Sequence, residues 1–152
     1  MSLGIMFYRV SMLPADLAGN PPTVTFNYET KHGDYKETFH PVSVKEIVGF
    51  LKDAYAVQQF FVPNERDGVV DIISTDQLRN LNSKCTWVLS HIGQDNFLTI
   101  ARGTLPDKNL MKEPPLQADI DWYIEYLKET VKVIDNMPPL KPNQTYRYSY
   151  WY

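Results

Sequence analysis

Cysteine is nearly absent from this sequence, since Cys85 is the only one among 152 residues. A single thiol cannot form an internal disulfide framework, and this usage suits a reducing compartment, so we expect a cytoplasmic protein. Cys85 also has no histidine beside it in the sequence. We therefore interpret it as a buried structural thiol rather than as a nucleophile.

Blocks of positive charge and long apolar runs are also missing. The formal net charge is −3, and acidic and basic residues are mixed along the chain. The sequence thus has no electrostatic footprint for duplex nucleic acid or for an anionic membrane. The apolar run at residues 5–10 is too short and too interrupted for a signal peptide or a membrane span. We expect neither nucleic acid nor a membrane as the partner.

The common motifs of catalysis and cofactor binding are lacking. The sequence has no glycine-rich phosphate loop, no Gly-x-Ser-x-Gly elbow and no His-Glu-x-x-His helix. The three histidines, His32, His40 and His91, have no second His or Cys two or four residues away, and no His/Cys cluster exists. We expect no metal and no cofactor, and the missing motifs argue against the common enzyme classes.

Aromatic residues are what the sequence has in excess, with 10 tyrosines, 7 phenylalanines and 3 tryptophans. At residues 145–152 every second residue is a tyrosine, so in a strand these rings share one face. The rings either cover a sheet face within the protein, which we favour, or form an adhesive edge for a partner or a second copy. The members of this tyrosine row are Tyr146, Tyr148, Tyr150 and Tyr152, with Arg147, Ser149 and Trp151 on the opposite face.

Periodic patterns predict several strands and two hairpins. The segments share β-branched and aromatic composition, and we expect strands at residues 5–13, 23–30, 35–40, 69–73, 86–92, 97–105 and 145–152. The two hairpins would cover residues 23–40 and 86–105, and residues 13–22 would form a proline-rich loop.

Helical spacing of apolar residues predicts two long amphipathic helices, at about 43–61 and 119–137. Ser43 and Glu46 form a capping box at the start of the first helix. A second capping signature at residues 74–77 predicts a short helix that ends near Asn82. We expect residues 1–152 to form a single α+β domain, in which a mainly antiparallel β-sheet packs against the two long helices.

The predicted hairpin at 86–105 carries polar residues in an apolar pattern. One strand register places Trp87 and His91 on the same face as Arg102, and a shift of one residue separates Trp87 from Arg102. If the strand at 69–73 lies beside this hairpin, Asp71 could meet His91 or Arg102 and form a perturbed pair in a cleft. The structural alternative is a hydrogen-bonded His91, with both charged side chains in ordinary surface ion pairs.

Two functional hypotheses follow from these patterns. The favoured one is a non-enzymatic protein-interaction module of accessory, inhibitor or immunity type, which binds a protein partner or forms a homodimer through an aromatic surface. The other is a small-ligand-binding protein or hydrolase-like enzyme, with residues 13–22 and 106–117 as rims of its pocket. The first surface would comprise Tyr146, Tyr148, Tyr150, Trp151 and Tyr152, and the pocket Asp71, Trp87, His91 and Arg102.

Overall fold

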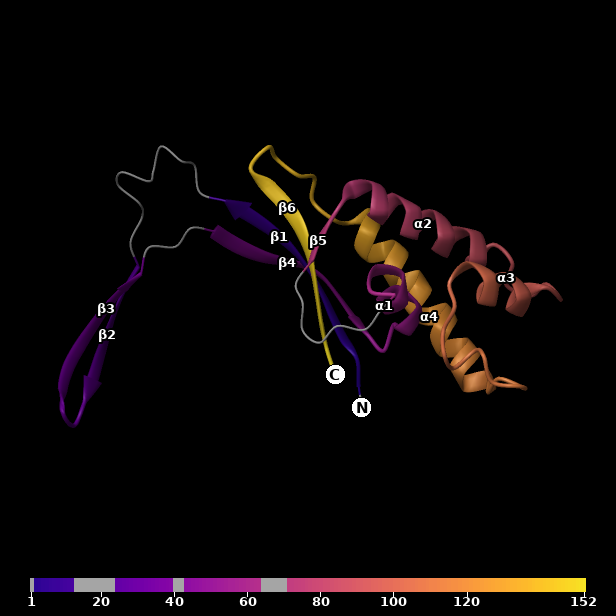
Figure 1. Cartoon of the computed structure of the whole chain (residues 1–152), viewed down its shortest axis with the longest axis horizontal. Helices are drawn as coiled ribbons and strands as arrows, with labels where there is room; N and C mark the ends of the chain where they lie inside the picture. Colours follow the sequence, from indigo (N-terminus) through magenta and orange to yellow (C-terminus); the bar gives the residue numbers. More distant parts are fainter. Residues whose placement is uncertain (1, 13–23, 40–42, 64–70) are drawn as a thin grey trace.

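The structure, a computed structural model, describes residues 2–12, 24–39, 43–63 and 71–152. It confirms the α+β fold, because these ranges contain a four-stranded antiparallel sheet and four helices (Figure 1). The strands across the sheet are β4 (Ser43–Lys52), β1 (Gly4–Met12), β6 (Gln144–Trp151) and β5 (Asp71–Ile73). The helices are α1 (Tyr55–Phe61), α2 (Thr75–Leu89), α3 (Phe97–Thr104) and α4 (Gln117–Asp135).

Strands β1 and β4 pair antiparallel from Gly4↔Lys52 to Met12↔Ser43. The chain between them therefore leaves and re-enters the sheet at the same end. The segment between β1 and β4 contains a hairpin of β2 (Val24–Thr30) and β3 (Gly33–Phe39). This finding confirms the hairpin predicted at 23–40. Figure 1 shows this hairpin projecting away from the four-stranded sheet.

The helices lie on one side of the sheet and bury that face (Figure 1). In the middle of the face Phe7 of β1 lies between Gly49 of β4 and Tyr148 of β6. Phe61 of α1 contacts both rings, with centroids 5.9 Å from Phe7 and 4.8 Å from Tyr148. A Cβ atom at Gly49 would lie 2.3 Å from Val133 of α4, so this close approach of the helix requires glycine.

The two long helices of the structure are α2 and α4, and each buries one stripe of side chains at three- and four-residue spacing. Asn82 of α2 donates a hydrogen bond of 3.0 Å to the Asp135 carboxylate of α4, which links the exposed edges of the two helices. The buried stripes consist of Leu78, Leu81, Cys85 and Val88 on α2 and of Tyr123, Tyr126, Leu127 and Thr130 on α4.

The predicted helix at 43–61 is wrong in its first half. Residues 55–61 form α1, whereas Ser43–Lys52 is the edge strand β4. The pairing with β1 shifts its register between Phe7 and Tyr8, where Gly49 and then Ile47 are the partners. This bulge places Ile47 and Phe50 on the same face although they are three residues apart, and the spacing therefore imitates a helix.

The predicted hairpin at 86–105 is also wrong. The capping box at Ser74 and Gln77 is present, with bonds of 3.0 and 2.8 Å, but the helix that it opens continues past Asn82 to Leu89. Residues 97–104 then form α3. The buried positions keep helical spacing up to Val88, so packing against the core outweighs the β-like composition of this segment.

The other predicted elements are confirmed where the structure describes them. The loop predicted at 13–22 and the first residues of the strand predicted at 69–73 lie outside the described residues. The confirmed elements are the strands at 5–12, 71–73 and 144–151 and the helix at 117–135.

Substitution of the central tyrosine of β6 tests this core. Tyr148 is fully buried, whereas Tyr152, just after the same strand, is 42% exposed. We expect Tyr148→Ala to lower the free energy of unfolding by about 3–5 kcal/mol, since it leaves a ring-sized cavity. The matched Tyr152→Ala variant should lose less than about 1 kcal/mol. Urea denaturation measures both, and equal losses would contradict the described burial.

Candidate functional site

The face of the sheet that turns away from the helices is the first candidate site. In Figure 1 the helices lie only on the other side of the sheet. Four large apolar side chains on this face, one or two from each of three strands, are 42–60% exposed: Ile47, Phe50, Ile72 and Trp151. We call this surface the open face. By strand register it comprises Gly4, Met6, Tyr8 and Val10 of β1, Lys45, Ile47, Phe50 and Lys52 of β4, Thr145, Arg147, Ser149 and Trp151 of β6, and Ile72 of β5.

An aromatic pair lies at one end of the open face. The indole ring of Trp151 lies across β1 at Gly4, where an added Cβ atom would be 2.4 Å from two ring carbons. The same indole meets the ring of Phe50, with a centroid distance of 6.1 Å and an interplanar angle of 31°. Glycine at position 4 therefore lets the Trp151 side chain of β6 lie across β1 and contact Phe50 of β4. Together with Lys52 these residues line a shallow hollow of about 430 Å³.

The middle of the open face is a row that crosses all four strands. Ile47 of β4 pairs with Tyr8 of β1, Tyr8 with Arg147 of β6, and Arg147 with Ile72 of β5. The Tyr8 hydroxyl donates to Met6 Sδ at 3.1 Å, so its polar end remains on this surface. The Nε atom of Arg147 is buried and has no hydrogen-bond partner. The row thus combines aliphatic side chains with an unsatisfied guanidinium donor.

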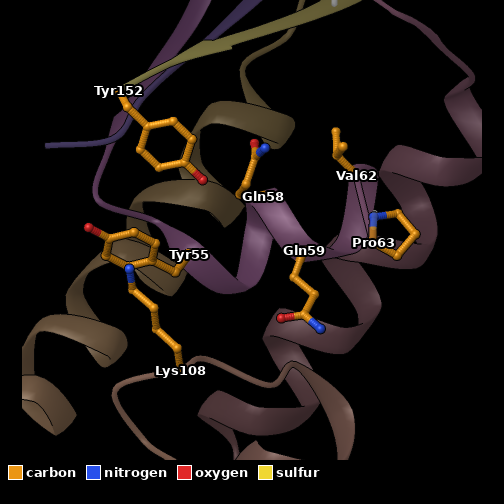
Figure 2. A pocket seen from close by; sticks show the side chains of 7 residues that line it. All are labelled: Tyr55, Gln58, Gln59, Val62, Pro63, Lys108 and Tyr152. Atoms are coloured by element: carbon orange, nitrogen blue, oxygen red, sulfur yellow. The ribbon is translucent and has the colours of Figure 1, made fainter. Parts of the chain in front are cut away.

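A second hollow of about 250 Å³ lies on the helical side, beneath the end of β6 (Figure 2). The ammonium group of Lys108 is 4.1 Å from the ring centroid of Tyr55, a cation–π contact. Gln58 is buried, and its Oε1 accepts a hydrogen bond from the Tyr148 hydroxyl while its Nε2 has no partner. The seven lining residues are Tyr55, Gln58, Gln59, Val62, Pro63, Lys108 and Tyr152.

These seven lining residues include no carboxylate, histidine, cysteine or hydroxyl-bearing serine or threonine. The groups of this lining that could act as nucleophile or base are therefore limited to the tyrosine hydroxyls and the Lys108 amine. Figure 2 shows the rings of Tyr55 and Tyr152 at one side of the hollow and Gln58 beside them.

The residues of the predicted pocket have separate surroundings. Trp87 lies in the last turn of α2 and His91 just after this helix. Their ring centroids are 4.4 Å apart, and His91 Nδ1 lies 2.8 Å from the carbonyl oxygen of Trp87. Arg102 lies on α3, where it donates to the carbonyl oxygens of Leu110 and Lys112 and pairs with a carboxylate, that of Glu113, at 2.8 Å. Through these contacts Arg102 holds residues 110–113 against α3.

Asp71 is placed only through its backbone, which pairs with Tyr148 in the sheet. Its side chain lies outside the described part of the structure. No described contact joins Arg102 to His91 or Trp87, so the structure gives no shared pocket for these residues.

The predicted aromatic surface is divided between the core and the exterior. Tyr146, Tyr148 and Tyr150 are buried under the helices, in agreement with the favoured interpretation of the tyrosine row. Trp151 and Tyr152 are each 42% exposed, so these two alone can meet a partner without unfolding. The sequence did not reveal the contributions of β4, Ile47 and Phe50, because their spacing resembles that of a helix. The alternation that placed Trp151 opposite the tyrosines was the available signal.

Metal sites and membrane spans were sought over the described ranges. There, no group of three or more His, Cys, Asp and Glu residues could hold a metal ion. None of the helices in these ranges is both long and apolar enough to cross a membrane. Comparison with known proteins gives no match: no family model fits the chain, and neither a curated protein nor a solved structure is significantly similar to it. Function must therefore be argued from the surface itself.

The thiol of Cys85 provides a test of the buried face of α2. Burial raises its pKa from 9.0 to about 12, so about one molecule in a thousand to ten thousand would carry the thiolate at pH 8 to 9. We expect no reaction of the native protein with Ellman's reagent at pH 8 and rapid reaction in concentrated guanidinium chloride. Any slow reaction of the native protein between pH 8 and 9 should occur through transiently opened molecules, in which the thiol has its ordinary pKa. Rapid labelling of the folded chain would contradict this packing.

Proposed function

We propose that this protein is a non-enzymatic interaction module that binds a protein partner through the open face. One observation carries the proposal: the sheet presents Ile47, Phe50, Ile72 and Trp151 on the side that the helices leave uncovered. A sheet in a globular protein normally buries an apolar face against another layer, and a contiguous exposed apolar surface marks an interaction site. The partner would supply the missing layer.

The energetics support a specific complex. Each of the four side chains has roughly half of its surface exposed. Covering that half is worth on the order of 1 kcal/mol per side chain, before the cost of association is subtracted. Trp151 and Phe50 add rigid aromatic area, and aromatic residues are enriched among those that dominate binding energy. This aromatic pair would therefore contribute most of the affinity.

An accessory, inhibitor or immunity-type role is compatible with this surface, and a lone buried thiol fits a cytoplasmic setting. A homodimer through the same face is the alternative form of the proposal. A hydrolase-like role lacks comparable support, because His91 and Arg102 contact different segments and the seven lining residues of the hollow in Figure 2 include no Asp, Glu, His, Cys, Ser or Thr.

Site-specific photo-crosslinking tests the open face as the binding surface. The photoreactive residue p-benzoylphenylalanine would replace Phe50, and a control would carry it in place of Trp87, which is 54% exposed on α2. In cells that produce the protein naturally, we expect a discrete adduct from position 50 and none from position 87. Its mass on a denaturing gel distinguishes another protein from a second copy. Adducts of equal yield from both positions, or none from position 50, would refute the proposal.

A further inference from the structure

We propose that the occupant of the open face is an acidic amphipathic segment, with an apolar stripe flanked by carboxylates. This inference rests on the proposed function and deepens it by naming the chemistry of the partner. It is drawn from the charges of the open face, the environment of Arg147 and the kinds of apolar side chain around them.

All the charged side chains that the described strands place on the open face are cationic. They are Lys45 and Lys52 on β4 and Arg147 on β6. None of the three is paired with a carboxylate, and the described part of this face contains no Asp or Glu. A protein of net charge −3 thus carries unpaired positive charge on the apolar sheet face that its described helices leave uncovered. Complementary potential requires a negative partner.

Among the arginines of the described ranges, Arg147 alone has no carboxylate partner. Its Nε atom is buried without a hydrogen-bond partner, in the row between Tyr8 and Ile72. A carboxylate that approaches a guanidinium side-on accepts from Nε and a terminal nitrogen together, which would satisfy this donor. The other three arginines each reach a carboxylate, at 2.6 Å for Arg9–Glu46, 3.2 Å for Arg79–Asp76 and 2.8 Å for Arg102–Glu113.

Two other occupants fit these observations less well. A second copy stacked on the open face would bring cations toward cations, and like charges oppose that pairing. Single-stranded nucleic acid would match the charge, but it requires separate aromatic platforms on which bases stack. Here Phe50 and Trp151 pack against each other, and the exposed Ile47 and Ile72 offer aliphatic surface instead. Aliphatic surface is suited to the apolar stripe of a protein segment.

Fluorescence of Trp151 can report binding to the open face directly. Trp87 and Trp122 are exposed on α2 and α4, so their replacement by phenylalanine leaves Trp151 as the single tryptophan. The probes are three helical peptides of about 18 residues with one leucine stripe, whose other positions are Glu, Gln or Lys. We expect the Glu peptide to shift the Trp151 emission and to bind at least about tenfold more tightly than the other two, with loss of that advantage near 0.5 M NaCl.

A matched arginine pair locates the charge effect. In the same background Arg147→Gln should weaken binding of the Glu peptide by about tenfold and leave the Gln peptide unaffected, because only a carboxylate gains from the guanidinium. Arg79→Gln is the control, since Arg79 is an exposed arginine on α2. Equal effects of the two substitutions would overturn the assignment of Arg147.

The remaining outcomes separate this inference from the proposed function. If the Glu and Gln peptides bind equally and Ile47→Ser/Phe50→Ser abolishes both, the acidic partner is wrong and the open face remains a protein-binding surface. Tighter binding of an oligothymidine than of the Glu peptide would replace the protein partner by nucleic acid. A solution mass of two chains that this double variant reduces to one would make a second copy the occupant. Absence of binding by every peptide, together with no adduct from position 50, would end both proposals.

Discussion

The contact between the rings of Phe7, Phe61 and Tyr148 is the interaction on which the rest of the structure depends. It joins β1 and β6, the two inner strands, to α1 at the centre of the helical face. Tyr148 also holds Gln58 through its hydroxyl group, so the same side chain fixes α1 in position. Because the helices cover one face only, most of the buried side chains of the sheet lie on that face. The opposite face can therefore carry side chains chosen for another purpose.

Local patterns were sufficient where an element has one dominant period. The strict alternation of β6 predicted that strand and the face that its tyrosines bury, and the apolar spacing of α4 predicted that helix. The β4 strand was not predictable in this way, because its bulge opposite Phe7 and Tyr8 gives Ile47 and Phe50 a helix-like spacing. The prediction for the end of α2 failed for the converse reason, since Val88, a β-branched residue, packs on the core there as part of a helix. Pairing with distant strands decides such cases, and one sequence contains little information about it.

The candidate site was predictable to a similar extent. From the sequence, Trp151 could be assigned to the surface opposite the tyrosine row. It lies there together with Arg147 and Ser149. The other members of the open face come from β1, β4 and β5, and they meet only through the strand order of the sheet. The abundant aromatic residues are thus divided between two locations. Tyrosines of β6 fill the core, while Phe50 and Trp151 form a pair outside it.

The position of β6 has a consequence for the order in which this protein can assemble. β6 follows every other element along the chain, yet it occupies an inner place between β1 and β5. Its register joins Trp151 to Gly4, almost the full length of the sequence away, and Figure 1 shows the two ends side by side. Closing so large a loop is entropically unfavourable and slows folding. On the ribosome the described sheet would remain in two parts, with β5 unattached, until β6 emerges.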